Sequence, residues 1–460
     1  MGVGELAARL DRLPISRFHR RVMLALAFAF FFELADLDTF AFAAPGIRKY
    51  LGIDVNQIAL ITAAGFLGMF LGASIGGWLA DRVGRRRAIV WSVIWYSIFS
   101  LLNAATYDVP TMLAARLLTG VGLSALTVIA ITYLSETMPY HRRGRIQAAT
   151  LGFGLIGIPA VAFLARGVVP LGSWGWRVVF LFGALGVFGL VVMSRLPESP
   201  RWLLNHGRVE DAERTLVAIE EETRGVEGEL PPVPAVPEHY GKERQVGLGD
   251  LFGPRLAGRT VLLWIVWIFQ TLGFYGFVSF VPTLLAAHGF SLVHSLTFSA
   301  ITTVGAVPGA FFAWLLSDRF GRKHSLWAVS LIIAACGLLY GAGFTNATIA
   351  LFGFLVGFFI QTFAALLYAY TPELYPTSIR NGGSGFAYGV GRLANIAGPF
   401  IVAALFGTYG YIWVFVYIAA CWLIVALVVG LWGASTARRE LEDLNTADAS
   451  TGQPHRTAPH

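Results

Sequence analysis

Twelve apolar runs, each close to the length of a membrane-crossing helix, constrain this sequence more than any other feature. A helix needs roughly 20 apolar residues to cross a bilayer, and the chain is 56% hydrophobic but only 13% charged. This pattern predicts an all-α integral membrane protein with twelve transmembrane helices. The expected spans are residues 21–46, 57–80, 88–106, 111–134, 146–166, 177–195, 259–285, 297–317, 326–344, 348–370, 382–405 and 411–433.

The basic residues predict the orientation of these spans. If the N-terminus is inside, only Arg48, Lys49, Arg166 and Arg177 lie in outer segments, and Arg116 and Arg392 lie within spans; the remaining Lys and Arg residues fall on the inner side. This positive-inside bias predicts a multi-pass protein of the inner (plasma) membrane with both termini in the cytoplasm. Because the basic residues lie in short loops between spans, we expect no nucleic-acid partner.

The cysteine and histidine pattern indicates no metal, cofactor or disulfide site. Cys336 and Cys421 both lie within expected spans, and the histidines lack ligand spacing. The first apolar run is too long for a cleavable signal peptide and has no small-residue cleavage site. We therefore expect no cofactor and no catalytic residues, and the sequence offers no constellation for a membrane enzyme.

A duplication with a constant offset organises the spans. The sequence GGWLADRVGRRR at 76–87 reappears as AWLLSDRFGRK at 313–323, and the two aspartates, Asp81 and Asp318, are 237 residues apart. Glu136 and Glu373, Arg143 and Arg380, and Pro45 and Pro282 keep the same offset. One offset shared by four landmarks indicates two parallel six-helix repeats, an arrangement in which two bundles rock about a midplane site.

The repeats divide the chain into five predicted parts. These are a cytoplasmic lead-in (1–20), an N-terminal six-helix bundle (21–195), a cytoplasmic linker (196–258), a C-terminal six-helix bundle (259–433) and a disordered tail (434–460). In the lead-in, Leu6, Leu10 and Leu13 predict an amphipathic face lying on the membrane surface. In the linker, an apolar stripe at helical spacing predicts an amphipathic helix. A proline-rich stretch then predicts an extended or flexible segment.

The D-R-x-G-R-[RK] loops resemble the signature of the major facilitator superfamily, and the resemblance covers nearly the whole chain. In that family such loops latch the two halves on the cytoplasmic side, which implies gating roles here, with Glu136 paired to Arg143 and Glu373 to Arg380. The alternative is that the arginines only anchor the topology, which would give no reason for acids at fixed offsets. The gating candidates are Asp81, Arg82, Gly84, Arg85, Arg86, Glu136, Arg143, Asp318, Arg319, Gly321, Arg322, Glu373 and Arg380.

Within the superfamily, PESPRWL at 197–203 and the Glu–Pro pairs resemble the sugar-porter and organic-ion branches. Several positions differ from the sugar-porter pattern, for example Leu151 where sugar porters have Gln and Tyr368 where they have Trp. The run YAYTPELYPTSIRN at 368–381 instead resembles organic-ion and synaptic-vesicle-like transporters, whose bacterial relatives include niacin and aromatic-acid proton symporters. Organic-anion members tend to have Arg seven residues before the span-11 proline, where this chain has Arg392.

Three carboxylates interrupt the first apolar run, namely Glu33, Asp36 and Asp38. Carboxylates at membrane depth cost about 2.5–3.5 kcal/mol on insertion scales, so they face protein or a watery cavity. Asp38-Thr39 resembles the Asp-Thr of sugar porters, and Arg116 resembles the span-4 arginine of the family. We expect Asp38 to pair with Arg116 as a proton switch, although a permanent structural ion pair is the alternative. Glu33 and Asp36 share a helix face and are further proton-site candidates.

These features together predict a monomeric, proton-coupled symporter of a small organic anion, such as an aromatic or pyridine carboxylate. Arg392 lies near the midplane, where a cation suits a carboxylate, although it could instead pair internally with Glu33 or Asp36. Further substrate-site candidates are Gln270, Tyr275, Gln361 and Tyr368. The alternatives are a sugar or polyol symporter, an exporter of organic cations or drugs, and a non-transporting sensor.

Overall fold

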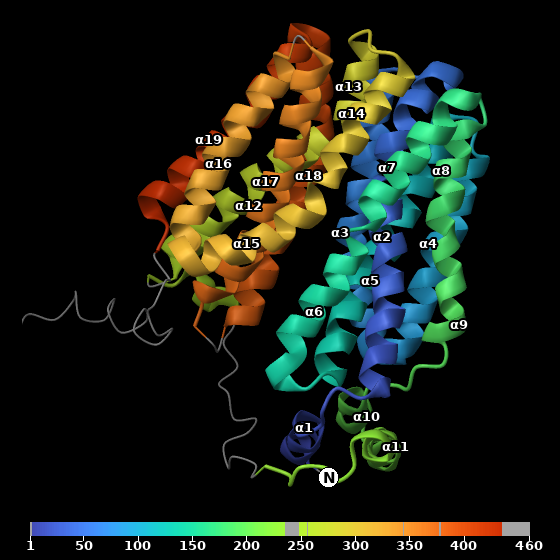
Figure 1. Cartoon of the computed structure of the whole chain (residues 1–460), viewed down its shortest axis with the longest axis vertical. Helices are drawn as coiled ribbons and strands as arrows, with labels where there is room; N and C mark the ends of the chain where they lie inside the picture. Colours follow the sequence, from blue (N-terminus) through green and yellow to red (C-terminus); the bar gives the residue numbers. More distant parts are fainter. Residues whose placement is uncertain (1, 235–247, 255, 344, 377–378, 435–460) are drawn as a thin grey trace, which may run out of the picture. The chain divides into compact units, whose positions relative to one another are not determined.

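A computed structural model describes the whole chain except residues 1, 235–247, 255, 344, 377–378 and 435–460. All regular elements in the described residues are helices (Figure 1). The expected disordered tail and part of the proline-rich linker lie outside the described residues. The chain separates into two compact units, which are described here one at a time.

Unit 1 comprises Met1–Lys242, Val278–Thr303 and Ile396–Thr408. It therefore contains the first repeat, the linker helices and two segments of the second repeat. One of those segments carries α13, which packs against α2. Its helices are α1 (Val3–Asp11), α2 (Arg17–Leu51), α3 (Val55–Val83), α4 (Arg85–Ala105), α5 (Val109–Thr137), α6 (Tyr140–Gly154), α7 (Gly157–Val168), η1 (Val169–Leu171), α8 (Gly175–Ala184), η2 (Leu185–Gly189), α9 (Leu190–Met193), α10 (Pro200–Asn205), α11 (Val209–Glu227), α13 (Val281–Ala287) and α14 (Leu292–Val304).

Unit 2 comprises Glu243–Phe277, Val304–Asn395 and Tyr409–His460. In it α16 packs between α17 and α19, and α15 packs on α17. Its helices are η3 (Leu248–Phe252), α12 (Ala257–Val278), α15 (Ala306–Phe320), α16 (Arg322–Gly341), α17 (Asn346–Glu373), α18 (Arg380–Tyr409, which continues into unit 1) and α19 (Tyr411–Trp432).

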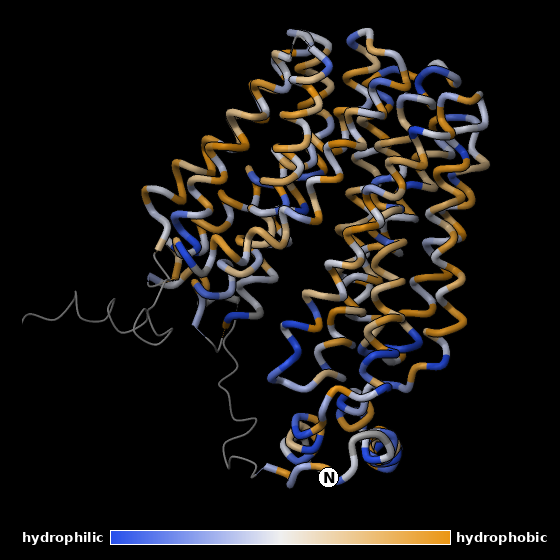
Figure 2. Tube along the Cα trace, viewed as in Figure 1, coloured by the Kyte–Doolittle hydropathy of each residue, from blue (hydrophilic) through white to orange (hydrophobic). Residues whose placement is uncertain are grey.

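Eleven helical segments of the described chain are long and apolar enough to cross a membrane. The tube of Figure 2 shows long hydrophobic stretches in both units, with hydrophilic residues gathered at helix ends and on α1 and α11. The 35-residue helix α2 is not among the eleven, because its central turns carry Glu33, Asp36 and Asp38. The structure therefore supports a many-span membrane fold, while the first of the twelve expected spans stays a prediction.

Glycines at matching positions let helices approach closely in both repeats. A Cβ added at Gly68 or Gly72 of α3 would collide with the backbone of α5 at Leu117 or Val121. In unit 2, a Cβ at Gly305 or Gly309 would likewise collide with the backbone of α17 at Phe354 or Phe358. Each contact in the second repeat lies 237 residues after its counterpart in the first. Small residues at such crossings allow backbones to touch inside a membrane, and here the duplication extends to helix packing.

The lead-in helix α1 packs on protein, contrary to the expected position on a membrane surface. Leu6, Leu10 and Leu13 are buried in one apolar cluster together with Leu216 and Ile219 of α11. The prediction was wrong because an amphipathic helix can bury its apolar face on any matching apolar stripe. Here the matching stripe lies on α11, about 200 residues later in the chain.

Ion pairs fix α1 on this linker helix. Arg9 contacts Glu213 at 2.6 Å and Glu220 at 2.7 Å, and Arg12 contacts Glu220 at 2.6 Å. The carboxylate of Asp11 also accepts a hydrogen bond from the backbone N–H of Tyr140, at the start of α6, at 2.8 Å. Together α1, α10 and α11 form a small polar-faced layer at one end of unit 1, visible at the bottom of Figure 1.

Candidate functional site

The three carboxylates of α2 are all enclosed by protein. Glu33 is 3% exposed, Asp36 is fully buried and Asp38 is 5% exposed. Since a carboxylate facing lipid would be costly, this burial agrees with the expectation that they face a protein interior. Their contacts differ, so each carboxyl group is described separately.

Asp36 faces the packing between α2, α4 and α8. Its Oδ1 accepts a hydrogen bond from Ser100 Oγ of α4 at 2.8 Å and one from Thr39 Oγ1 at 3.1 Å. On the side of α8, Gly183 lies so close that an added Cβ would collide with the same carboxyl group. The second oxygen, Oδ2, is buried without a hydrogen-bond partner among the described residues. Sequence reasoning found Asp36 but missed Ser100, since a lone serine in an apolar span carries no distinguishing pattern.

Arg116 of α5 reaches α2 without forming a contact ion pair. Its Nη1 donates to Thr39 Oγ1 at 3.4 Å, its Nη2 donates to the Leu37 carbonyl at 3.5 Å, and its guanidinium lies 5.5 Å from the ring centre of Phe40. Its charge acts on both Asp36 and Asp38. Thr39 therefore links Arg116 to Asp36, because its hydroxyl contacts both side chains.

Asp38 is near Arg116 but is not bound to it in this structure. Among the described residues, the Asp38 carboxylate makes no hydrogen bond and no ion pair within 4.0 Å, and it interacts with Arg116 through the electrostatic attraction of their charges. The expected direct pair is thus replaced by contacts of Arg116 with Thr39 and Leu37. The helical positions predicted proximity, whereas the rotamer of the arginine decides which acceptor it reaches.

Glu33 faces α5. Its Oε1 accepts a hydrogen bond from Thr127 Oγ1 at 2.6 Å, and the same hydroxyl also lies 3.1 Å from the Leu123 carbonyl. Glu33 and Asp36, expected on one face because they are three residues apart, therefore contact different neighbouring helices. Thr127 is a second contact residue that the sequence did not identify.

In unit 2, three aromatic side chains from α12, α17 and α18 form a cluster. The ring centres of Trp267 and Tyr388 are 4.6 Å apart, and Tyr368 lies 5.2 Å from each of them. Trp267 is fixed by a hydrogen bond from its Nε1 to Thr371 Oγ1 at 3.1 Å, whereas Tyr368 is 55% exposed. We call these three residues the aromatic cluster.

The predicted substrate residues lie on the same three helices. Arg392 is partly buried and follows Tyr388 by four residues, so both lie on one face of α18. Gln270 is buried on α12, three residues after Trp267, and its Oε1 lies 3.4 Å from Thr271 Oγ1. Tyr388 was missed, although its spacing from Arg392 could have revealed it.

Two further candidates lie on these helices. Gln361 is partly buried on α17, seven residues before Tyr368 and therefore on the same face. Tyr275, on α12, lies with its ring centre 4.8 Å from that of Phe274.

The repeated loops contain equivalent ion pairs. In unit 1, Arg85 contacts Asp81 at 2.5 Å and Glu136 at 3.0 Å. In unit 2, Arg322 contacts Glu373 at 2.7 Å, and these two residues lie 237 positions after Arg85 and Glu136. The loop of each repeat thus ties the start of one helix to the end of another. The side chain of Asp318 lies outside the described part of the structure.

The partner observed for Glu136 differs from the expected one. Glu136 pairs with Arg85, where Arg143 was expected, and Arg143 instead lies 5.8 Å from the ring centre of Tyr140. The repeat offset identified Glu136 and Arg143 as candidates. The arginine that reaches the Glu136 carboxylate is Arg85, at the start of α4. In unit 2, Arg380 donates to the Tyr375 carbonyl at 3.5 Å.

Both loops turn at a glycine with positive φ. Gly84 has φ of 101° and Gly321 has φ of 74°, a region that residues with a side chain rarely adopt. Around them, Arg82 lies over the Trp78 ring at 4.7 Å and Arg319 is exposed. The glycines end α3 and α15 and allow the next helix to start at once.

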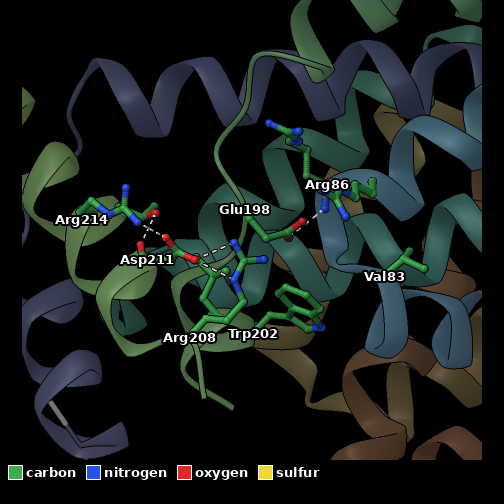
Figure 3. A pocket seen from close by; sticks show the side chains of 10 residues that line it. Val83, Arg86, Glu198, Trp202, Arg208, Asp211 and Arg214 are labelled. Atoms are coloured by element: carbon green, nitrogen blue, oxygen red, sulfur yellow. Dashed lines mark hydrogen bonds and ion pairs between the residues drawn. The ribbon is translucent and has the colours of Figure 1, made fainter. Parts of the chain in front are cut away.

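Figure 3 shows how the linker joins the first of these loops. The carboxylate of Glu198 accepts the backbone N–H of Arg86 at 3.0 Å, at the N-terminus of α4, where a negative group is stabilised. Trp202 donates from its Nε1 to the Asp81 carbonyl at 2.8 Å. Farther along, Arg208 and Arg214 both contact Asp211. These residues surround a cavity of about 280 Å³, and they attach the linker to the loop of the first repeat.

Comparison with known proteins agrees with this architecture. The family described as "Sugar (and other) transporter" matches residues 24–447. A putative metabolite transport protein of Bacillus subtilis, YyaJ, is 43% identical, with 95% of this chain and 96% of the relative covered. The niacin transporter NiaP of Acinetobacter baylyi is 31% identical, with 96% and 99% covered. Among solved structures, the chain resembles the xylose transporter XylE of E. coli in a partially occluded inward-open conformation, with a TM-score of 0.73. The two sequences are 18% identical, and the match covers 92% of this chain and 100% of that chain, which shows the same fold. The chain therefore belongs to the sugar (and other) transporter family of the major facilitator superfamily.

Proposed function

We propose that the protein is a proton-coupled symporter of a small organic anion, with an aromatic or pyridine carboxylate as substrate. The observation that carries this proposal is the placement of Arg392 one helical turn from Tyr388 in the aromatic cluster. A guanidinium binds a carboxylate through paired hydrogen bonds, while aromatic rings favour offset or edge contacts with another ring. The likeness to a niacin transporter supports the same substrate class.

The proton site in this proposal is Asp38, with Arg116 as its electrostatic partner. Asp38 makes no hydrogen bond to the described residues, so a proton can bind without displacing a donor. Asp36 is held by Ser100 and keeps Thr39 in place, and Thr39 in turn positions Arg116. In the proposed cycle Asp38 takes up a proton on the outer side, which removes its attraction for Arg116. The anion then meets Arg392, and the proton and the anion leave on the inner side. Glu33 is the second candidate for proton binding.

The same proposal assigns the remaining properties. The helix α2 is the first of twelve spans, both termini are cytoplasmic, and the protein is a monomer of the inner membrane. Protons supply the energy and no cofactor is required. The paired loops around Arg85 and Arg322 act as cytoplasmic gates.

Transport by purified protein in liposomes tests this function. With an imposed inward proton gradient, labelled nicotinate should accumulate, and excess hexose or quaternary amine should not compete. Arg392→Gln should raise the KM for nicotinate at least about tenfold, because loss of a charge-assisted hydrogen bond costs roughly 1.5–3 kcal/mol. The exposed Arg20→Gln, which removes a cation outside the candidate residues, is the matched control and should transport normally. The proposal would be contradicted if unlabelled hexose inhibited uptake and unlabelled nicotinate did not.

A second variant separates coupling from binding. Asp38→Asn should abolish accumulation driven by the proton gradient, because the amide cannot exchange a proton, while counterflow of labelled against unlabelled nicotinate continues. Accumulation against a gradient by Asp38→Asn would remove Asp38 from the coupling role.

A further inference from the structure

A second cavity in unit 1 lies where the end of α2 meets the turn between α13 and α14. It has a volume of about 640 Å³ and is lined by Arg48 and Lys49 of α2, by the following turn as far as Asp54, and by Phe290 and its neighbours. All of these residues belong to unit 1. A volume of this size is typical of cavities that hold small molecules. We call it the Arg48 cavity.

The charges in the Arg48 cavity do not balance. Among the described residues, the guanidinium of Arg48 makes no hydrogen bond or ion pair. The ammonium of Lys49 makes none either and lies 5.2 Å from the ring centre of Tyr50. The single carboxylate, Asp54, is used as a helix cap, because it accepts the backbone N–H of Gln57 at 2.7 Å. Cations in the last turn of a helix are favoured by its dipole. The helix dipole explains why Arg48 and Lys49 are tolerated at the end of α2. It does not explain why both line a cavity without an acidic partner.

The turn between α13 and α14 supplies an aromatic residue to the cavity lining. Phe290 is partly buried and packs edge-on against Phe298, with ring centres 5.9 Å apart, which fixes the orientation of its ring. The backbone N–H of Phe290 is bonded to the Leu285 carbonyl at 3.1 Å, so the turn itself is held. The lining thus combines a ring from this turn with two cations from α2, a combination that matches a planar aromatic carboxylate.

We infer that the Arg48 cavity is an entry site that binds the aromatic carboxylate substrate at the outer face before it reaches Arg392. This inference rests on the proposed function, since the outer position follows from the proposed topology and the ligand from the proposed substrate class. Clusters of one charge sign raise the local concentration of an opposite charge and the rate at which it is captured. Arg48 and Lys49 are two of the four Lys and Arg residues in the expected outer segments, and the other two, Arg166 and Arg177, do not line the cavity.

The test compares nicotinate uptake by the Arg48→Gln/Lys49→Gln variant with uptake by the unaltered protein in liposomes. The double variant should raise KM about three- to tenfold and leave the maximal rate per inserted protein unchanged. The difference should shrink at high salt, because screening removes attraction between exposed charges. Arg48→Lys, which keeps the charge, should retain a low KM.

The matched control is Arg166→Gln, which removes one cation from the same proposed face. Arg166 is exposed and bonded to Thr297 at 2.9 Å, and it does not line the cavity. An equal rise in KM in this control would show general surface attraction and overturn the site. A second variant, Phe290→Leu, should raise KM for nicotinate but not for an aliphatic carboxylate.

The possible failures are distinguishable. If the unaltered protein transports nicotinate and the double variant keeps its KM, the entry site is wrong and the proposed function stands. If the unaltered protein transports no aromatic carboxylate, both the function and the entry site fall. A lowered maximal rate with unchanged KM in the double variant would also overturn the site, since it would indicate a purely structural role.

Discussion

At the scale of single residues, the close approach of Gly183 to Asp36 restricts what the first repeat tolerates. A methyl group at position 183 would collide with the Asp36 carboxyl group, so α2 and α8 must separate or the carboxyl group must lose its bond from Ser100. Gly183→Ala should therefore destabilise the protein by about 1–3 kcal/mol, as overpacking does elsewhere. Thermal unfolding in detergent measures the change.

The matched control for this substitution is Gly167→Ala in α7. No atom lies within 4 Å of a Cβ added at Gly167, and alanine favours a helix more than glycine does. Its unfolding temperature should stay equal or rise slightly. Equal losses in the two variants would show that the Asp36 contact is not the cause.

Single residues also show how far the sequence could lead. Glu33, Asp36, Asp38 and Arg116 were identified because a charge in an apolar span is expensive and therefore has a reason to be there. Their hydroxyl partners carry no such signal, since serine and threonine are common in membrane spans. The structure lacks the predicted direct contact between Asp38 and Arg116, because side-chain rotamers are set by packing that the sequence alone does not show.

At the scale of elements, the crossing of α3 and α5 depends on Gly72. A Cβ at this position would collide with the backbone of Val121, so Gly72→Ala should push the helices apart and lower the unfolding free energy by about 1–3 kcal/mol. Gly77→Ala, on the same helix but with open space around it, is the control. The equivalent Gly309→Ala should behave like Gly72→Ala, and a neutral result for both would contradict the shared packing.

The attachment of α1 to α11 should depend on pH through Glu220. Burial alone would raise the pKa of Glu220, but hydrogen bonds from Arg9 and Arg12 outweigh burial and hold the pKa below its ordinary value of 4.5. A lowered carboxyl pKa gives stabilisation that is complete above the ordinary value and is lost as the pH falls through the folded value. Protection of α1 in hydrogen exchange should thus be constant from pH 7 to 5 and fall below about pH 4.

A Glu220→Gln variant is the reference for that measurement. It lacks the charge at every pH, so its α1 protection should already be reduced at pH 7, and the further acid-induced loss should be smaller than in the unaltered protein. Equal acid sensitivity of the two proteins would assign the titration to another group.

The docking of α1 could not be predicted from its own residues, because its apolar face would fit a lipid surface as well as the stripe on α11.

At the scale of the whole molecule, the duplication predicts that equivalent ion pairs act independently. Arg85–Glu136 lies within unit 1 and Arg322–Glu373 within unit 2. Arg85→Gln and Arg322→Gln should each lower the unfolding free energy by about 1–3 kcal/mol. The double variant should show the sum within about 0.5 kcal/mol, as sites that share no partner do. A large deviation from additivity would mean that the two loops are coupled.

The constant offset was the most informative feature for the whole fold. It located both loops with their glycines and arginines, and both glutamates, because duplicated helices repeat their packing as well as their order. It did not predict that Arg85 and Arg322 are the arginines that contact the glutamates. It could not show that Val278–Thr303 clusters with the first repeat, since that grouping depends on the conformation of the chain.

The ion-paired α1 and α11 also offer a practical advantage for spectroscopy. Both helices belong to the same unit and are tied by Arg9 and Arg12 to Glu220, so two dyes attached to their solvent-facing sides should keep one separation during turnover. Such a pair would serve as an internal length standard, against which any dye that changes its distance can be calibrated in the same molecule.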